Sequence, residues 1–471
     1  MSRLPWAGRR LHIVGVGGAG MSAYARAAAR LGASVTGSDQ AESPFAEGLR
    51  ADGVLDAMIG HDPGNLPDAA GLEVFFSSAI EPDNVELVAA RGRGLSVAPR
   101  ADLLGELSRL RRTIGVAGAH GKTTTASMIA TALRGCGLDP GYLIGGTLRA
   151  SGRNGEWGTG EWLVVEADES DRSMLALDVE VAVLTSVELD HHAAFGSLLE
   201  LEGAYREFLS GPPDAVIWNR PELLGLRDGR VVAYDARVVD LAGGGARFDF
   251  HGRSVTLGVP GAHNALNAAA ALEVCRVVGA DMDLAIASLE AFAGAGRRFE
   301  LLGTTDRGAV VYDDYAHHPT ELRATLAAAR TLGFRRVVAV FQPHLYSRTR
   351  QLAREFGAAL AAADLVVVVD VYPARERAVD FPGVSGRLIA AAVVDAAVGL
   401  PVYWLPGIDD AERVLRGLLA DGDLCLVIGA GDIDRLGRRL VAGAGEAGVG
   451  EAGAGAAGAG AAGRSGRPVV S

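Results

Sequence analysis

Residues 115–125 read GVAGAHGKTTT, and this stretch predicts a loop that binds nucleotide phosphates. A strand-like run, residues 112–116, leads into it, and a helix-compatible run, residues 124–130, leads out. In this setting small residues let backbone N–H groups face an anion, and the helix N-terminus adds partial positive charge. The lysine is placed to reach the outer phosphates. We therefore expect ATP here, bound by Gly118, Ala119, His120, Gly121, Lys122, Thr123 and Thr124.

The spacing of this loop differs from that of the common phosphate loop, which has a glycine five residues before the second one. That position is Val116 here, and the nearer glycine is Gly118, so the loop is a shorter G-x-x-G-K-T-T variant. A chance Gly-Lys-Thr turn in a glycine-rich chain is the alternative interpretation, and the flanking strand and helix count against it. The variant spacing narrows the choice of family more than a standard loop would.

Composition and charge exclude several classes of protein. At 471 residues, 49% of them hydrophobic, the chain is long enough for about three domains with cores of their own. A net charge of -12 argues against broad binding to nucleic acid or to an anionic membrane. The three cysteines form no C-x-x-C pair, so neither a disulfide framework nor a cysteine zinc site is expected. No signal region and no apolar run of about 18 residues is visible, so we expect a cytoplasmic protein without membrane insertion.

Strand-like runs alternate with alanine-rich helical stretches along the chain, which is the signature of parallel α/β sheets. Two junctions, near residues 103–111 and 294–299, divide the series into three α/β modules. Between residues 231 and 260 short alternating strands predict a small β subsheet. The domains predicted are residues 1–104, 105–296 and 297–440, followed by a disordered Gly/Ala-rich tail over residues 441–471.

The first module opens with a second glycine-rich turn, GVGGAG at residues 15–20, placed after a strand and before a helix. A G-x-G-x-x-G turn in this place predicts binding of a diphosphate, with Asp39 positioned for a ribose hydroxyl. A nicotinamide dehydrogenase would use the same turn, but the separate phosphate loop counts against it. Two serines after another strand could add donors, although an ordinary strand end explains them equally well. The residues expected at this ligand are Gly17, Gly18, Ala19, Gly20, Asp39, Ser77 and Ser78.

Carboxylates and histidines follow two strands of the second module. The strand at residues 162–166 ends in EADESD, which begins with Glu166, and the next strand leads to ELDHH at residues 188–192. A carboxylate at a strand end facing a phosphate loop is a natural Mg²⁺ ligand, and a histidine there could complete a second metal position. A solvated acidic loop and a surface histidine pair are the alternatives.

Polar residues also begin a helix after Pro260, in GAHNALNA at residues 261–268. Asn264 and Asn267 share a face at the helix start, where amide side chains can bond a base or a phosphate. Capping of the helix is the alternative interpretation.

The third module carries DDYAHHPTE at residues 313–321 and FQPHLYSRTR at residues 341–350, each after a strand. Together, cationic and carboxylate side chains suit recognition of a zwitterionic amino acid. Structural ion pairing is the alternative for the arginines. An arginine would bind the carboxylate of the amino acid and an aspartate or histidine its amine, and the two motifs supply Asp314, His317, His344 and Arg348 for these roles.

The motifs GAHGKTTT, EADESD, ELDHH, GAHNALNAAAA, GAGRRFE, DDYAHHPTE and FQPHLYSRT, in this order, resemble the ATP-dependent Mur ligases of peptidoglycan synthesis over roughly residues 10–440. GVGGAGMSAYA, SSAI and DDYAHHPTE resemble the members that add L-alanine to UDP-N-acetylmuramate. The resemblance implies a Rossmann-like UDP-sugar domain, a P-loop ATPase domain with a central parallel sheet and a small β subsheet, and a Rossmann-like C-terminal domain for the amino acid.

The resemblance also implies the reaction. ATP phosphorylates the lactyl carboxylate of UDP-N-acetylmuramate, and the amine of L-alanine attacks the acyl phosphate to form an amide. Lys122 would neutralise the migrating phosphoryl group, Thr123 and Glu166 would hold Mg²⁺, and His191 would position a second Mg²⁺. The catalytic residues implied are Lys122, His191, His344 and Arg348, and Arg297 and Arg298 would lie at a hinge.

Other interpretations stay open at this point. A ligase of the same family could join a recycled muropeptide to UDP-N-acetylmuramate, and a nucleotide-gated binding protein could keep the folds without catalysis. The run 192–195, HAAF, departs from the family pattern after His191, which puts the support of that histidine in doubt. The oligomeric state expected is a monomer or a homodimer.

Overall fold

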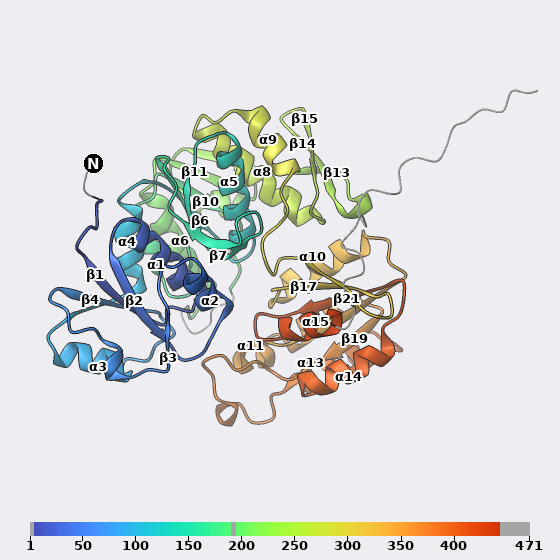
Figure 1. Cartoon of the computed structure of the whole chain (residues 1–471). Helices are drawn as coiled ribbons and strands as arrows, with labels where there is room; N and C mark the ends of the chain where they lie inside the picture. Colours follow the sequence, from blue (N-terminus) through green and yellow to red (C-terminus); the bar gives the residue numbers. More distant parts are fainter. Residues whose placement is uncertain (1–3, 190–194, 443–471) are drawn as a thin grey trace, which may run out of the picture.

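The computed structural model describes residues 4–189 and 195–442, which form three α/β lobes in chain order (Figure 1). Each lobe is built on a mainly parallel sheet, and the central lobe carries an additional three-stranded antiparallel sheet. The predicted α/β class and its three modules are thereby confirmed. Of the described helices, none is long and apolar enough to cross a membrane.

The N-terminal lobe is a five-stranded parallel sheet in the order β3-β2-β1-β4-β5. The chain order reverses on either side of β1, which makes the carboxyl end of β1 the place where such folds bind a ligand. Its strands are β1 (Arg10–Val14), β2 (Ser34–Asp39), β3 (Met58–Ile59), β4 (Leu72–Phe76) and β5 (Ser96–Pro99), and its helices are α1 (Ala19–Arg30), α2 (Pro44–Ala51), α3 (Val85–Gly92) and α4 (Arg100–Ser108). The predicted boundary after residue 104 falls inside α4.

The central lobe holds a seven-stranded sheet in the order β12-β11-β10-β6-β9-β7-β8, in which β8 runs antiparallel to β7. Its strands are β6 (Arg112–Ala117), β7 (Gly141–Leu148), β8 (Arg153–Glu156), β9 (Trp162–Glu166), β10 (Val181–Leu184), β11 (Asp214–Trp218) and β12 (Val231–Tyr234). The antiparallel sheet comprises β13 (Arg237–Asp240), β14 (Ala246–Phe250) and β15 (Arg253–Leu257), so the predicted subsheet exists, but its first strand, β12, belongs to the main sheet. The helices are α5 (Lys122–Gly135), α6 (Leu198–Ser210), α7 (Pro221–Leu224), α8 (Ala262–Val277) and α9 (Met282–Glu290).

The C-terminal lobe holds a six-stranded sheet in the order β16-β17-β21-β18-β19-β20, parallel except for β16. Its strands are β16 (Glu300–Thr304), β17 (Val310–Asp314), β18 (Arg336–Phe341), β19 (Leu365–Val368), β20 (Val402–Trp404) and β21 (Asp423–Ile428). Its helices are α10 (Pro319–Arg330), α11 (Tyr346–Gln351), α12 (Ala353–Leu360), α13 (Gly386–Ala396), α14 (Ile408–Leu418) and α15 (Asp434–Val441). Apart from Val441 and Ala442, the predicted tail lies outside the described residues.

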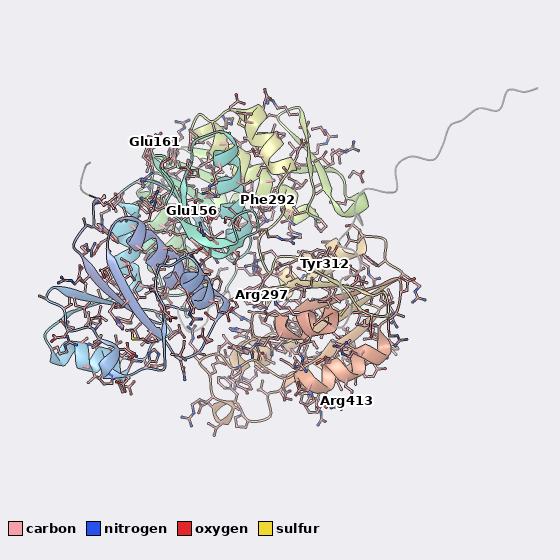
Figure 2. The ribbon with its side chains drawn as sticks, in the orientation of Figure 1. Glu156, Glu161, Phe292, Arg297, Tyr312 and Arg413 are labelled. Atoms are coloured by element: carbon pink, nitrogen blue, oxygen red, sulfur yellow. The ribbon has the colours of Figure 1, made fainter. Side chains whose placement is uncertain are left out.

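The lobes differ in how they are joined. Leu11 and Ile13 of β1 share one buried apolar cluster with Leu163 and Val165 of β9, so the N-terminal and central lobes have a continuous core. The buried clusters of the C-terminal lobe contain no described residue before Phe299. Polar side chains make that junction instead, and Figure 2 shows Arg297 where the two lobes meet. Removing apolar surface from water favours a fixed arrangement, so we expect the first two lobes to move together and the third to move against them.

A buried polar network fixes α3 against the N-terminal sheet. Glu86 of α3 is fully buried, and its Oε2 lies 2.9 Å from His12 Nε2 on β1 and accepts a 2.8 Å hydrogen bond from Ser38 Oγ on β2. Its Oε1 accepts a 2.9 Å hydrogen bond from Asn65 Nδ2. Burial alone would raise the pKa of Glu86, but the hydrogen bonds from His12, Asn65 and Ser38 lower it to about 2.

Glu86→Gln is therefore expected to destabilise the protein in a pH-dependent way. The folded pKa lies below the ordinary value of 4.5, so the carboxylate stabilises the fold above about pH 4.5 and loses this contribution as the pH falls toward 2. The difference corresponds to roughly 3 kcal/mol at neutral pH. Urea unfolding of both proteins measures it: the gap in unfolding free energy should narrow below about pH 4. A gap that stays constant between neutral pH and about pH 3 would contradict this assignment.

Candidate functional site

The phosphate loop connects β6 to α5, and its backbone needs glycine at two positions. Gly118 has φ +129°, and a Cβ there would lie 2.1 Å from Thr185 Oγ1. Gly121 has φ +83°, and a Cβ there would lie 2.6 Å from Asn267 Oδ1. Residues just after β10 hold the loop, since His120 N donates to Ser186 Oγ at 2.9 Å. Thr123 and Thr124 lie in the first turn of α5, so the predicted strand, loop and helix are all present.

Lys122 is the only lysine in the sequence. Its Nζ donates to the Gly118 carbonyl at 2.7 Å and to Glu169 Oε1 at 2.9 Å. Burial by itself would lower the pKa of Lys122, but the carboxylates of Glu169, Asp168 and Glu166 raise it above its ordinary value. The amine is therefore held as a cation at the mouth of the loop, where phosphate oxygens would replace its present carbonyl and carboxylate partners.

Thr123 and Glu166 come together beside Lys122. Thr123 Oγ1 donates to Glu166 at 3.0 Å, and Glu166 Oε2 also accepts from the backbone N–H of Gly145 at 2.6 Å. A hydroxyl and a carboxylate are hard oxygen donors of the kind that Mg²⁺ prefers, so this pair fits the metal predicted there. The third predicted ligand, His191, lies outside the described residues.

A pocket opens between the phosphate loop, the start of α8 and the start of α10. Asn264 and Asn267 are buried in its wall; Asn264 Nδ2 donates to the Pro260 carbonyl at 2.7 Å, and Asn267 Oδ1 accepts from Thr125 Oγ1 at 3.2 Å. The lining comprises His120, Gly121, Thr124, Thr185, Ser186, Val187, Glu188, Trp218, Arg220, Glu222, Leu223, Tyr234, Val259, His263, Asn264, Leu266, Asn267, Phe292, Gly294, Ala295, Arg298, Phe299, Asp314, Thr320, Glu321, Ala324 and Thr325. An apolar and aromatic cavity at the end of a phosphate loop suits a base and ribose.

The glycine-rich turn of the first lobe has the predicted geometry. Gly17 N donates to Asp39 Oδ2 at 2.8 Å, and a Cβ at Gly17 would lie 2.9 Å from that oxygen. Gly18 precedes α1, whose first residues are Ala19 and Gly20, so the helix N-terminus points at the turn. Ser77 lies beside it, because its N–H donates to the Val14 carbonyl at 3.0 Å, and Ser78 is the next residue. Asp39 thus shapes the turn itself, and its contact with a ribose stays a prediction.

Arg100 connects this turn to the acidic loop after β9. Its Nη2 donates to Asp168 Oδ2 at 2.8 Å, its Nε donates to Asp171, and its Nη1 lies 3.1 Å from where a Cβ at Gly20 would be. The guanidinium is mostly buried, with 14% of the side chain exposed. One cation therefore joins the glycine-rich turn to the acidic loop, which begins at Glu166, the predicted metal ligand, and pairs with Lys122 through Glu169.

Arg100→Gln is expected to lower the unfolding free energy by roughly 2–4 kcal/mol, because it leaves two carboxylates facing each other without their shared cation. Urea denaturation measures the loss. Arg50→Gln is the matched control, since Arg50 also pairs with two carboxylates, Glu42 and Asp56, but on the open surface. No measurable change is expected for that variant. If the two substitutions changed the unfolding free energy equally, the Arg100 bridge would contribute no more to stability than a surface ion pair does.

The C-terminal lobe brings together three of its four predicted residues. His344 lies beside the buried Arg348, with 3.3 Å between His344 Nδ1 and Arg348 Nη1, and its ring centroid is 6.0 Å from that of His317. Asp314 lines the pocket described above, where it accepts from the backbone N–H groups of Phe299 and Ala316 at 2.8 Å. Burial raises the pKa of Asp314 despite the nearby Arg298. Its place on the amino-acid side therefore stays a prediction.

The two hinge arginines point to different lobes. Arg297 donates to the Gly429 carbonyl at 2.7 Å and pairs with Asp313 at 3.2 Å, so it is anchored in the C-terminal lobe. Arg298 donates to Thr123 Oγ1 at 3.3 Å. Arg298 therefore contacts the predicted metal ligand Thr123 of the central lobe, and its contact with the substrates on domain closure stays a prediction.

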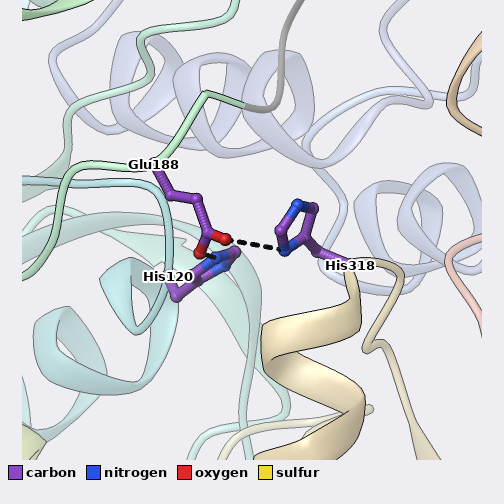
Figure 3. Close-up of side chains that lie close together, drawn as sticks. All are labelled: His120, Glu188 and His318. Carbon is purple, nitrogen blue, oxygen red and sulfur yellow. Dashed lines mark hydrogen bonds and ion pairs between the residues drawn. The ribbon is translucent and has the colours of Figure 1, made fainter. Parts of the chain in front are cut away.

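The same junction contains a cluster that the sequence analysis did not single out as a site: His120, Glu188, His318 and Glu321 (Figure 3 shows the first three). His120 Nε2 lies 2.8 Å from Glu188 Oε2, and His120 Nδ1 lies 3.3 Å from Glu321 Oε1. Burial alone would lower the pKa of His120, but Glu188 and Glu321 raise it to about 9. All four residues lie in the quoted motifs, yet only the folded chain shows that these motifs meet across two lobes.

Three family profiles match the chain in order. The profile "Mur ligase family, catalytic domain" matches residues 10–112, "Mur ligase middle domain" matches residues 116–275, and "Mur ligase, glutamate ligase domain" matches residues 297–431. Together they span most of the chain, and each falls on one of the three lobes.

Curated relatives and solved structures agree with these profiles. The UDP-N-acetylmuramate--L-alanine ligase of Nocardia farcinica is 43% identical to this chain, and the alignment covers 94% of this chain and 96% of the relative. The ligase of the same name from Rubrobacter xylanophilus is 42% identical, covering 92% and 99%. Among solved structures, the UDP-N-acetylmuramate-alanine ligase of Thermotoga maritima matches with a TM-score of 0.78 at 28% identity, covering 92% of this chain and 98% of that one.

Proposed function

This chain belongs to the Mur ligase family, and from that premise we propose that it is an ATP-dependent ligase that joins UDP-N-acetylmuramate to L-alanine. The product is an amide between the lactyl carboxylate of the sugar and the amine of the amino acid, formed in peptidoglycan precursor synthesis. The observation that carries the proposal is the phosphate loop with Lys122 at its mouth, set between the diphosphate turn of one lobe and the polar cluster of another.

The geometry supports a different binding role for each of the three lobes. The turn at Gly17 and Gly18 receives the diphosphate of the UDP-sugar at the N-terminus of α1. The phosphate loop receives ATP, with its base directed into the pocket walled by Asn264 and Asn267. His317, His344 and Arg348 of the third lobe supply the cation and the polar groups that an amino-acid carboxylate needs.

Phosphoryl transfer to a carboxylate needs charge stabilisation more than covalent help from the protein. Lys122 is already a cation at the loop, and Arg298 adds a second positive charge from the opposite lobe. Thr123 and Glu166 would hold one Mg²⁺ and His191 would help to hold a second, and these ions would supply charge neutralisation on the phosphate oxygens. The shared apolar core holds the first two lobes in a fixed relative orientation. Closure of the third lobe onto them would then bring the amine of the amino acid to the activated carboxylate.

The nicotinamide dehydrogenase that the glycine-rich turn left open has no support in the relatives, which are named as ligases. We place the reaction in the cytoplasm, where ATP and nucleotide sugars are made, with the chain acting as a monomer or a homodimer.

ADP release with defined substrates tests the proposal. The full set of ATP, Mg²⁺, UDP-N-acetylmuramate and L-alanine should give ADP and amide product in equal amounts, and omission of any one should abolish both. The competing family reaction, ligation of a recycled muropeptide, predicts ADP release with a tripeptide and no response to alanine. That second pattern would overturn the assignment to L-alanine.

A further inference from the structure

We propose that His120, Glu188 and His318 form a binding site for a transition-metal ion of the Zn²⁺ class, which bridges the central and C-terminal lobes. This site is separate from the Thr123–Glu166 pair and goes beyond the ligase reaction. One ligand atom from each of the three residues lies within 4.8 Å of the others. Each residue comes from a different segment: the phosphate loop, the connection after β10, and the residue before α10 (Figure 3).

The distances place the two imidazoles on opposite oxygens of one carboxylate. Glu188 Oε2 lies 2.8 Å from His120 Nε2, and Glu188 Oε1 lies 3.8 Å from His318 Nδ1. The ring centroids of the two histidines are 5.0 Å apart. Two nitrogens and one carboxylate oxygen at this spacing form a three-ligand set of the kind that catalytic zinc sites use, with a fourth position left for water.

Groups behind the three ligands are arranged as in protein metal sites. Glu321 Oε1 lies 3.3 Å from the other ring nitrogen of His120, at an angle that makes no regular hydrogen bond, and Thr320 Oγ1 donates to Glu188 Oε1 at 2.9 Å. A carboxylate on the far nitrogen of a metal-bound histidine fixes its ring and raises its basicity, and an outer hydrogen bond orients a ligating carboxylate.

Burial and charge also suit a cation. The side chains of His318 and His120 are 4% and 16% exposed, while that of Glu188 is 38% exposed and lines the nucleotide pocket, which gives an ion a path of entry. Glu188 supplies a negative charge at the site, and Glu321 supplies a second one that it shares with Arg298 at 3.9 Å and His317 at 3.5 Å. A bound metal ion would take the place of the proton on His120 and release it to solvent.

The donor set also distinguishes this site from the predicted magnesium site. Imidazole nitrogen suits Zn²⁺, Co²⁺ and Ni²⁺, whereas Mg²⁺ prefers oxygen ligands such as those of Thr123 and Glu166. Because His120 belongs to the phosphate loop and His318 to the third lobe, an ion here would tie that lobe to the rim of the nucleotide pocket. Excess Mg²⁺ should not displace it.

Metal titration of the full-length protein tests this site. Chelator-treated protein is titrated with Zn²⁺ in saturating Mg²⁺ against a chromophoric competitor, and Co²⁺ serves as a spectroscopic probe, since tetrahedral Co²⁺ absorbs strongly in the visible. Wild type should bind one more Zn²⁺ than His318→Gln. The outer variant Thr320→Val should keep the stoichiometry but bind Zn²⁺ about 10–100-fold more weakly.

His251→Gln is the matched control, because His251 also faces a carboxylate, Glu273 Oε1 at 2.6 Å, but lies on an exposed turn away from the pocket. It should bind Zn²⁺ as wild type does. Circular dichroism and thermal unfolding without metal establish that each variant is folded, and Thr320→Val tests the site even where the buried His318→Gln is destabilised. Unchanged Zn²⁺ stoichiometry and affinity in both site variants would overturn the proposal, as would loss of the same Zn²⁺ in the His251 control.

Discussion

Lys122→Ala is expected to lower kcat by about 10³-fold or more, because it removes the cation that would meet the transferring phosphoryl group. The variant contains no lysine at all, since Lys122 is the only one in the sequence. No other lysine side chain can therefore substitute for it. Steady-state ADP release with saturating substrates gives kcat, and Lys122→Arg, which keeps the charge but not the compact ammonium group, should recover only part of it.

Stability has to be separated from catalysis in this experiment. Lys122 faces the buried Glu169 at 2.9 Å, and the Glu169 side chain is only 2% exposed. Removal of one partner of a buried pair costs roughly 3–5 kcal/mol. The double variant Lys122→Ala, Glu169→Gln removes that carboxylate charge as well, so it should regain most of the lost stability while its kcat stays low. Recovery of activity along with stability would mean that Lys122 has a structural role only.

Glu166→Gln is expected to lower kcat/KM by at least about 10²-fold and to shift the Mg²⁺ dependence of the rate to higher concentrations. The substitution replaces one carboxylate oxygen by an amide nitrogen where Thr123 Oγ1 and Gly145 N now converge on the two oxygens. Amide nitrogen cannot ligate Mg²⁺, so the ion would be held by fewer donors. The rate measured across a series of Mg²⁺ concentrations separates weaker metal binding from slower chemistry.

The matched control for Glu166→Gln is Glu156→Gln. Glu156 belongs to the same lobe and lies on β8, where it pairs with Arg134 at 2.6 Å; Arg134 is in the last turn of α5, whereas the phosphate loop precedes the first turn of that helix. The rate of the Glu156→Gln variant should depend on the Mg²⁺ concentration as the wild-type rate does. If Glu166→Gln also showed an unchanged Mg²⁺ dependence, Glu166 would not be the metal ligand.

Local pattern was enough to predict the elements that carry the nucleotide loop. β9 has the bounds expected from its apolar run, Trp162–Glu166, because the strand is buried on two faces and reads as a continuous hydrophobic stretch. The hairpin of β7 and β8 was not foreseen, since its glycine-rich sequence, GYLIGGTLRASGRNGE, has only two β-branched residues, Ile144 and Thr147, of the kind typical of strands.

Some residues of the candidate site could be predicted from the sequence and others could not. Lys122, Thr123 and Glu166 follow from motif and strand order, because the carboxyl ends of β6 and β9 meet at one edge of a parallel sheet. The contact of His120 with Glu321 could not be foreseen, since it joins residues about two hundred positions apart through the orientation of two lobes. The orientation of the Asp314 side chain could not be predicted either. Its strand places the residue at the carboxyl edge of the sheet, as expected, but the carboxylate accepts hydrogen bonds from backbone N–H groups.

Transfer of an oxygen atom tests most directly the claim that the loop around Lys122 activates a carboxylate. UDP-N-acetylmuramate labelled with ¹⁸O in its lactyl carboxylate is incubated with the enzyme, ATP, Mg²⁺ and L-alanine, and the phosphate released is analysed by mass spectrometry. An acyl phosphate leaves one carboxylate oxygen on the phosphate, so each phosphate released should carry one ¹⁸O when both carboxylate oxygens are labelled. Unlabelled phosphate formed together with the amide product would contradict the account.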